Sequence, residues 1–529
     1  QELQKEFSLS SENILELAEW AVKVEEHYNQ FYGANQCYDI EFAFDGLERK
    51  MYLVQVRPET IHSGESKAES NCLIQYSLTP KHDQNTKRIL SGTSIGNSIV
   101  TGTVRMVMNL DERGDNQEII FNPGDILVTS STDPDWEPLM KKAGGIITDC
   151  GGRTSHASIV SRELGVTCVV GTGDATSVLK NGQVVTIDCS HGDTGYVYSG
   201  QVDFSQVKVD LNSLPKSPIP LMMNLASPEI AFRYARLPHC GVGLAREEFI
   251  INNFIQVHPL ALLDYDTGSF WDQPELKNQI ENLIRGYDSG RDYFINKLTY
   301  GISRIATAVD PHPVIVRFSD FKSNEYANLL GGDLYEPKEE NPMLGWRGCS
   351  RYYSKEYREA FGLECAAIKK VREELGLSNV IVMLPFCRTP EEFNRVAQVM
   401  ADFGLVRGQN GLQVYLMCEL PSNVILAQEF CQLVDGFSIG SNDLTQLTLG
   451  IDRDSDRLAH LFNENHQAVR EMISQAIRVC RSNDVKIGIC GQGPSDNLDF
   501  AEFLVKQGID TISLTPDSLV GAIQRLSKI

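Results

Sequence analysis

The chain has 529 residues, which at about 150 residues per domain predicts three or four domains instead of one large core. Hydrophobic residues make up 42% and charged residues 22%, a balance that excludes a disordered chain and a collagen-like fibre. No apolar run approaches the roughly 18–20 residues that cross a bilayer, and the net charge of −22 without a Lys/Arg-rich stretch argues against a nucleic-acid partner.

The first 60 residues predict a helix followed by two strands. Helical patterning covers 11–20, and strand-like runs follow at 38–44 and 51–56, on either side of a turn at Asp45-Gly46. The next segment, 61–85, is polar and then mixed, so we expect a linker there.

A compact module is predicted over 90–200. This stretch is rich in Gly, Val, Ile and Thr, which indicates short strands joined by tight turns, with one clear helix after Thr154. Three prolines between Asp203 and Pro220 predict a second linker.

Beyond Pro220, eight short apolar runs alternate with long helical segments, a pattern typical of a (β/α)8 barrel. Nearly continuous apolar runs are expected of parallel strands that are buried on both faces. The runs are 221–225, 241–245, 314–318, 380–384, 412–418, 436–439, 486–489 and 511–514. Polar residues follow several of these runs, at the barrel rim where catalytic groups converge.

The first candidate for chemistry is His156, in the string Gly-Gly-Arg-Thr-Ser-His. Two glycines permit the tight backbone that turns a strand into a helix, and Thr154 or Ser155 can cap that helix. His156 would then lie in the first turn, where free N–H groups and the helix dipole favour an anion such as a phosphoryl group on the imidazole. The alternative is a surface histidine at a helix start.

Four arginines at the predicted rim indicate an anion pocket. A guanidinium keeps its charge and grips phosphate or carboxylate through two donors, so several at one rim describe a pocket for a dianion. The alternative is a solvated surface arginine. It is weaker for Arg317, which follows a buried strand, and for Arg347, which follows Trp346. The four are Arg246, Arg317, Arg347 and Arg453.

Two carboxylates and a thiol complete the predicted rim. Glu419 and Asp443 end neighbouring strands, the usual arrangement for Mg²⁺ or Mn²⁺, although Asp443 could instead cap a helix. Cys490 alone among thirteen cysteines ends a strand inside a Gly-rich turn, where we expect the thiol to be open to substrate.

Three strings resemble the phosphoenolpyruvate (PEP)-utilising enzymes: GGRTSHASIVSRELG around His156, FSIGSNDLTQLTLGIDRD (437–454) and GICGQ (488–492). The resemblance implies a multidomain α/β protein with a swivelling β/β/α phosphohistidine domain and a C-terminal PEP/pyruvate-binding (β/α)8 barrel. The expected domains are an ATP-grasp remnant at 1–70, the phosphohistidine domain at 85–202 and the barrel at 217–529.

The resemblance also implies roles for single residues. His156 would carry the phosphoryl group, and Thr154 would be the target of a regulatory kinase/phosphorylase. In the barrel it implies four phosphate-binding arginines, two Mg²⁺ ligands, an amide for the substrate carboxylate and a thiol that exchanges the methyl proton. These are Arg246, Arg317, Arg347 and Arg453; Glu419 and Asp443; Asn442; and Cys490.

Within the family, the stretch RFSDFKSNEYANLLGG (317–332) resembles the phosphoenolpyruvate synthases, which convert ATP, pyruvate and water to AMP, PEP and phosphate. Residues 39–59 resemble the last strands of their ATP-grasp domain, which implies that Glu41 and Gln55 approach Mg–ATP and Arg57 its phosphates. Two alternatives stay open: a pyruvate phosphate dikinase, and a phospho-relay protein that resembles enzyme I of the sugar phosphotransferase system.

Other expectations concern the whole protein. Scattered cysteines without a CxxC pair fit a reducing cytosol, and family likeness implies a homodimer. The chain starts with Gln1, and the resemblance implies that the bulk of an ATP-grasp domain should precede this residue. We therefore expect a fragment that transfers phosphate between His156 and pyruvate but does not use ATP.

Overall fold

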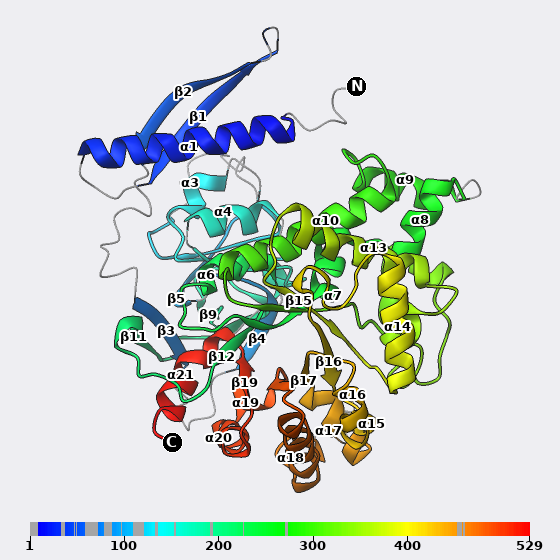
Figure 1. The fold of residues 1–529 in the computed structure, drawn as a ribbon. Coiled ribbons are helices and arrows are strands. Elements are labelled where there is room, and N and C mark those ends of the chain that lie inside the picture. Colours follow the sequence, from blue (N-terminus) through cyan, green and yellow to red (C-terminus); the bar gives the residue numbers. More distant parts are fainter. Residues whose placement is uncertain are drawn as a thin grey trace. The chain divides into compact units, whose positions relative to one another are not determined.

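The computed structural model forms two units, residues 65–213 and residues 1–64 together with 214–529 (Figure 1). It describes residues 9–32, 37–46, 48, 50–58, 72–78, 87–96, 98–108, 121–132, 136–152, 155–164, 166–190, 194–225, 227–269, 273–451, 458 and 461–529. No helix in these ranges has both the length and the apolar character of a membrane span.

The N-terminal segment has the predicted helix and hairpin. Helix α1 runs over Ser11–Tyr32, and strands β1 (Tyr38–Asp45) and β2 (Lys50–Pro58) pair antiparallel. The register shifts between Glu41 and Phe42, so that the hairpin contains a β-bulge.

Within residues 65–213, seven strands close into a barrel in the order β10-β4-β8-β7-β6-β5-β9. They are β4 (Arg88–Ile95), β5 (Ile99–Met106), β6 (Ile126–Thr129), β7 (Gly145–Thr148), β8 (Thr167–Val170), β9 (Val184–Asp188) and β10 (Thr194–Ser199). Helices α3 (Glu137–Met140), α4 (His156–Leu164) and α5 (Ala175–Val178) connect them. Alternate residues of β6 join different apolar clusters, because side chains of a strand point to opposite faces.

The two predicted linkers are wrong in part, because each contains a strand. β3 (Cys72–Leu78) and β11 (Phe204–Asp210) pair antiparallel along their whole length, from Cys72 opposite Asp210 to Leu78 opposite Phe204. Neither strand has a partner close in sequence, so local composition gave no sign of the pairing.

The C-terminal part is a closed barrel of eight parallel strands in chain order, as predicted. They are β12 (Leu221–Leu225), β13 (Val242–Arg246), β14 (Val314–Arg317), β15 (Val380–Leu384), β16 (Val414–Cys418), β17 (Gly436–Ile439), β18 (Lys486–Ile489) and β19 (Thr511–Leu514). β12 pairs with β19 and closes the ring. The predicted runs match these strands or differ from them by one or two residues at an end.

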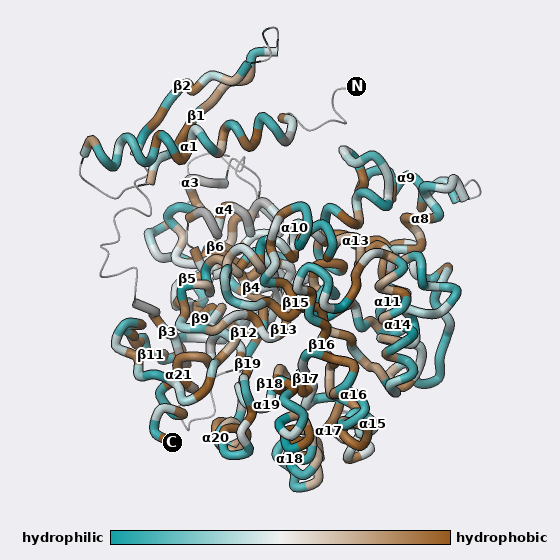
Figure 2. Tube along the Cα trace, in the orientation of Figure 1, coloured by the Kyte–Doolittle hydropathy of each residue, from teal (hydrophilic) through white to brown (hydrophobic). Residues whose placement is uncertain are grey.

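Helices between and after the strands cover the barrel. They are α6 (Ala231–Tyr234), α7 (Glu247–Ile250), α8 (Pro259–Thr267), α9 (Pro274–Leu283), α10 (Gly290–Val309), α11 (Ser323–Tyr326), α12 (Cys349–Tyr352), α13 (Arg358–Lys369), α14 (Pro390–Asp402), α15 (Pro421–Ile425), α16 (Ala427–Phe430), α17 (Ser441–Leu449), α18 (Gln467–Ser482), α19 (Gly493–Asp496), α20 (Leu498–Gln507) and α21 (Pro516–Leu526). Figure 2 shows the resulting distribution of hydropathy: strands such as β16 are hydrophobic (brown), whereas α18 is largely hydrophilic (teal). On α18, one face of the helix is buried because apolar residues recur every three or four positions.

The barrel interior is filled with side chains and is no pore. Met222, Leu244, Ile315, Met383 and Tyr415, with Met417 and Cys490, form one buried cluster of residues from different strands. Polar chemistry is therefore confined to the ends of the strands.

Candidate functional site

Parallel pairing brings the predicted rim residues to one end of the barrel. Arg246 and Arg317 are the last residues of β13 and β14. Glu419 follows β16 directly, and Cys490 follows β18. Asp443 lies in the first turn of α17, which begins two residues after β17 ends.

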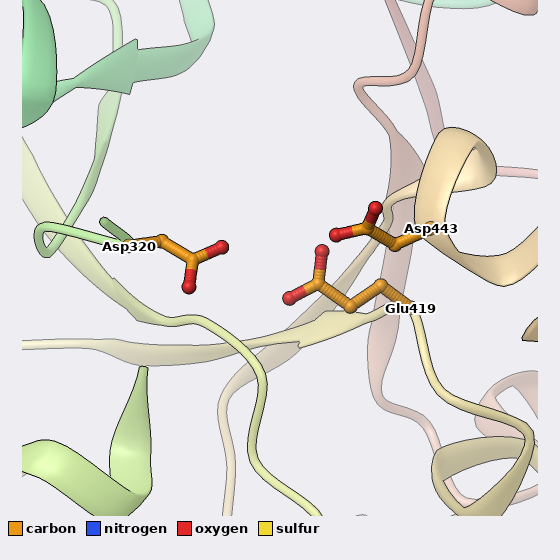
Figure 3. Close-up of side chains that lie close together, drawn as sticks. All are labelled: Asp320, Glu419 and Asp443. Carbon is orange, nitrogen blue, oxygen red and sulfur yellow. The ribbon is translucent and has the colours of Figure 1, made fainter. Parts of the chain in front are cut away.

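Three buried carboxylates, Asp320, Glu419 and Asp443, lie together at this rim (Figure 3). One oxygen of each lies within 4.8 Å of the other two. Burial and the neighbouring charges of Asp443 and Asp320 raise the pKa of Glu419 to about 8, against the opposing effect of the arginines. A divalent cation would remove that repulsion, and carboxylate oxygens are the ligands that Mg²⁺ and Mn²⁺ prefer, so the donor set fits the predicted metal.

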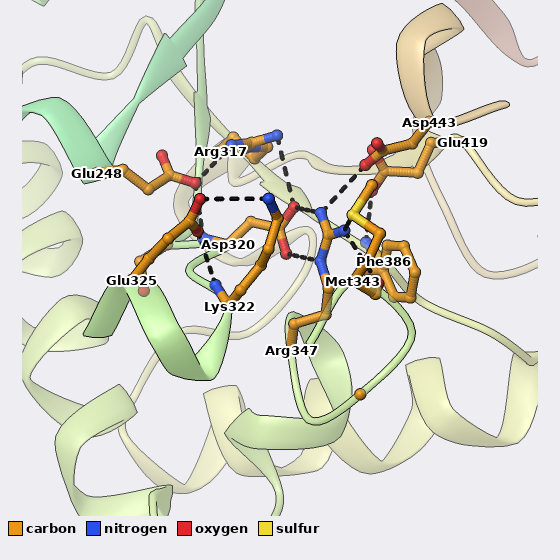
Figure 4. Close-up of polar contacts among 12 residues, drawn as sticks. Glu248, Arg317, Asp320, Lys322, Glu325, Met343, Arg347, Phe386, Glu419 and Asp443 are labelled. Atoms are coloured by element: carbon orange, nitrogen blue, oxygen red, sulfur yellow. Dashed lines mark hydrogen bonds and ion pairs between the residues drawn. The ribbon is translucent and has the colours of Figure 1, made fainter. Parts of the chain in front are cut away.

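Asp320 is already engaged by an arginine. Its Oδ1 accepts from Nε of Arg347 at 3.0 Å and its Oδ2 from Nη2 at 2.5 Å (Figure 4). Although burial opposes ionisation, Arg347 and Arg317 lower the pKa of Asp320. The two carboxylates left for a cation are the predicted pair, Glu419 and Asp443. Arg347 also reaches this pair, through Nη2 to Oδ2 of Asp443 at 3.1 Å.

Arg317 is held by a second acidic residue. Its Nη2 donates to Oε1 of Glu248 at 2.5 Å, and that oxygen also accepts from the backbone N–H of Asp320 at 2.7 Å. Among the described residues, the buried Nε of Arg317 has no hydrogen-bond partner. A substrate anion would supply the acceptor that this donor lacks.

Arg246 lies beside Arg317 in the register of β13 and β14 but is more exposed than the other two described arginines. Arg246 is exposed, and its guanidinium carbon lies 5.0 Å from the ring centroid of Phe249. Asn442 is half-buried in the first turn of α17, next to Asp443. Arg453 lies outside the described residues, so its place at the rim stays a prediction.

Cys490 has the predicted position but not the predicted openness. Its side chain is only 3% exposed, and Sγ lies 3.7 Å from the carbonyl oxygen of Ile439. The reason is close packing, since the side chain belongs to the buried cluster that fills the barrel interior. Burial raises the pKa of the thiol to about 11, while a hydrogen bond with Ser438 and the charge of Arg317 act in the opposite direction. The thiol is therefore protonated at neutral pH.

In residues 65–213, several contacts hold the described residues near the start of α4. Gly151 adopts φ +117°, where a Cβ would lie 2.8 Å from the Ser155 hydroxyl. The Asp149 carboxylate accepts from the backbone N–H of Thr176 at 2.9 Å, and the Ser158 hydroxyl donates to the Gly152 carbonyl at 2.7 Å. His156 is the first residue of α4, as predicted, and Thr154 lies outside the described residues.

The three predicted nucleotide-site residues are neighbours on the β1–β2 hairpin. Glu41 pairs with Gln55 across the strands, and Arg57 pairs with Asp39. The Arg57 guanidinium lies 3.6 Å from carboxylate oxygens of both Asp39 and Glu41, and all three side chains are exposed.

Sequence reasoning missed two acidic residues of the rim, Asp320 and Glu248. Each lies two or three residues after a predicted arginine, Asp320 after Arg317 and Glu248 after Arg246. An acid that close to a strand-end arginine is a signal that could have found them, because a buried guanidinium needs a partner.

Family models match most of the chain. The PEP-binding domain of the PEP-utilising enzymes matches residues 205–529, and the mobile domain of these enzymes matches 121–192. The AMP/ATP-binding domain of pyruvate phosphate dikinase matches residues 1–75.

Two curated relatives are named phosphoenolpyruvate synthase. That of Aquifex aeolicus is 51% identical over 98% of this chain and 64% of its own length, and that of Synechocystis is 51% identical over 99% and 62%. The chain thus spans less than two thirds of the length of these relatives. Among solved structures, an HpcH/HpaI aldolase from Desulfitobacterium hafniense is 14% identical over 57% of this chain and 86% of its own, with a TM-score of 0.28.

Proposed function

Because the chain belongs to the PEP-utilising enzymes, we propose that its barrel site interconverts pyruvate and PEP by phosphoryl exchange with His156. The whole protein would then be a phosphoenolpyruvate synthase, converting ATP, pyruvate and water to AMP, PEP and phosphate. The observation that carries the proposal is a rim where Arg317 and Arg347, both largely buried, lie with the carboxylates Glu419 and Asp443.

The substrate would bind through charge. Arg317 and Arg347 would hold the phosphate, with Arg246 and Arg453 as further cations, and Asn442 would donate to the carboxylate. Glu419 and Asp443 would hold Mg²⁺ or Mn²⁺, and the bound cation would supply positive charge to stabilise the enolate.

In the direction that forms pyruvate, the P–O bond of PEP breaks as a P–N bond forms to the His156 imidazole. The methylene carbon then takes a proton from the Cys490 thiol, which is in the protonated form that this step needs. In the reverse direction the thiolate accepts a methyl proton, and the enolate oxygen attacks phosphorus. The arginines stabilise charge on the transferring group, the main requirement of phosphoryl transfer.

The remaining roles follow the family. Glu41, Gln55 and Arg57 would contribute to the Mg–ATP site, and Thr154 would be the target of a regulatory kinase/phosphorylase. The protein would be a cytosolic homodimer. Its identity as a synthase and not a dikinase is supported by the stretch 317–332 and by the names of the relatives.

Incubation with PEP labelled in its phosphate tests the proposal. We expect label on His156, its release when excess unlabelled pyruvate is added, and no label in His156→Ala. Absence of label from the wild-type chain in the presence of Mg²⁺ would contradict the proposed half-reaction. In the full-length protein, label transfer from ATP to inorganic phosphate instead of water would identify a dikinase. Transfer from PEP to a small carrier protein would identify a relay.

A further inference from the structure

Phe386 has an unusual backbone for a bulky residue. It follows β15 by two positions, is 2% exposed and adopts φ +45°, in the left-handed region that favours glycine. Such a conformation costs on the order of 1–3 kcal/mol and persists only where the surroundings impose it. In this turn, Phe386 contacts both Glu419 and Arg347.

The backbone of Phe386 contacts the predicted metal ligand. Its N–H donates to Oε1 of Glu419 at 2.7 Å. The residues on either side are also held, since the Pro385 carbonyl accepts from the N–H of Cys349 at 3.2 Å and the Cys387 carbonyl accepts from Nδ2 of Asn423 at 2.7 Å. The left-handed turn thus fixes an N–H against one oxygen of Glu419.

The ring of Phe386 contacts the predicted phosphate ligand. The guanidinium carbon of Arg347 lies 4.0 Å from the ring centroid, within the range of a cation–π contact (Figure 4). Arg388 approaches the same ring at 4.9 Å and donates to the Gly345 carbonyl at 2.7 Å, so it ties the turn to the loop that carries Arg347.

We infer that Phe386 is a positioning residue that sets Glu419 and Arg347 relative to each other, through its N–H and its ring respectively. Its effect on substrate rests on the proposed function, whereas its effect on the cation ligand does not. A buried apolar residue that served only the core would need neither the left-handed turn nor the contact with a guanidinium.

Three substitutions separate the two contacts. Phe386→Leu removes the ring face but keeps an apolar side chain of similar size, so we expect KM for PEP in His156 labelling to rise about tenfold, with Mn²⁺ affinity within twofold of wild type. Phe386→Gly also removes the ring but adopts the left-handed turn without strain, so Mn²⁺ affinity stays near wild type. Phe386→Ala keeps no bulky side chain to hold the turn and, unlike glycine, is strained there, so it should leave the left-handed region and weaken Mn²⁺ binding about fivefold.

Phe500, 1% exposed in α20, provides the control, because Phe500→Leu causes a similar loss of buried apolar packing, there against Phe503. Titration of free Mn²⁺ by electron paramagnetic resonance and labelling kinetics are the two readouts. The inference is overturned if Phe386→Ala and Phe386→Gly bind Mn²⁺ equally, or if Phe386→Leu changes KM no more than Phe500→Leu does. A wild-type chain that binds Mn²⁺ but not PEP overturns the proposed function, and the Ala and Gly variants still decide the inference; one that binds neither overturns both.

Discussion

Both carboxylate oxygens of Asp320 accept hydrogen bonds from Arg347, at 3.0 Å from Nε and 2.5 Å from Nη2. This fork fixes the plane of the guanidinium, so that Nη1 donates to the Met343 carbonyl at 3.3 Å and Nη2 also donates to Oδ2 of Asp443 at 3.1 Å. Since Asp320 lies three residues after Arg317, one loop orients both arginines.

Asp320→Asn should weaken the hold on Arg347 without removing any group that we expect to touch the substrate. We expect KM for PEP to rise about 10- to 100-fold, since a buried guanidinium loses an ionised partner. The measurement is the PEP dependence of His156 labelling. Asp402→Asn is the control, because Asp402 pairs with Arg358 on the surface; an equal effect of both changes would contradict the role of Asp320.

Cys490→Ala should block proton exchange between the pyruvate methyl group and solvent, which deuterium incorporation measures by NMR. We expect exchange to fall at least 100-fold while PEP still labels His156, because the proposed role of the thiol is confined to the proton step. Cys480→Ala removes another buried thiol, in α18, and should leave exchange unchanged. Normal exchange in the Cys490 variant would show that another group moves the proton.

Glu419→Gln removes one charge from the predicted cation site. We expect Mn²⁺ affinity to fall about 10- to 100-fold, because a neutral amide attracts a divalent cation far less than a carboxylate does. Equilibrium titration measures the affinity, with Glu429→Gln on the exposed side of α16 as control. Unchanged affinity in Glu419→Gln would place the cation elsewhere.

Glu364→Gln tests a buried acid behind the rim. Burial raises the pKa of Glu364 from 4.5 to about 7, although hydrogen bonds from Ser319 oppose this effect, and burial also raises the pKa of Glu247 beside it. The folded chain thus binds a proton more tightly than the unfolded chain. The stability that this proton contributes is complete below about pH 4.5 and is lost as the pH rises through about 7.

The variant cannot ionise at this position, so its thermal midpoint relative to wild type should rise between pH 5 and pH 8. The corresponding change in the free energy of unfolding, variant relative to wild type, is on the order of 2 kcal/mol between these two pH values. Melting curves across this range measure it, and a constant difference between variant and wild type would show that Glu364 does not titrate there.

Gly348→Ala should destabilise the barrel by about 2–4 kcal/mol. Gly348 has φ +55°, and a Cβ there would lie 2.6 Å from the Pro385 carbonyl and 2.7 Å from Cβ of Phe386. Gly376→Ala is the control, with φ +72° but open space around it, so it reports the backbone cost alone, about 1 kcal/mol. Equal urea midpoints for the two variants would contradict the predicted clash.

The barrel could be predicted because its strands are buried on both faces and therefore have a local apolar signature, as in 380–384 and 436–439. The paired strands β3 and β11 could not, since each is stabilised by a partner far away in sequence. The same distinction applies to the rim. Strand-end positions such as Glu419 follow from the strand pattern.

The contacts that orient these side chains did not follow from the sequence. Asp320 grips Arg347 across a loop, and Phe386 contacts Glu419 only because its backbone turns into a region that sequence does not reveal. Loop conformations of this kind depend on tertiary contacts, which no local pattern encodes.

The antiparallel pair of β3 and β11 forms a two-stranded stem for the unit of residues 65–213. β3 is the first described strand of this unit and β11 the last, and seven paired positions, from Cys72–Asp210 to Leu78–Phe204, hold the two strands side by side. A body held by one stem can turn by changing a few backbone angles at its base, without breaking any bond inside its closed barrel. His156, the first residue of α4, belongs to this unit, so any turn at the base of the unit would displace this residue with it.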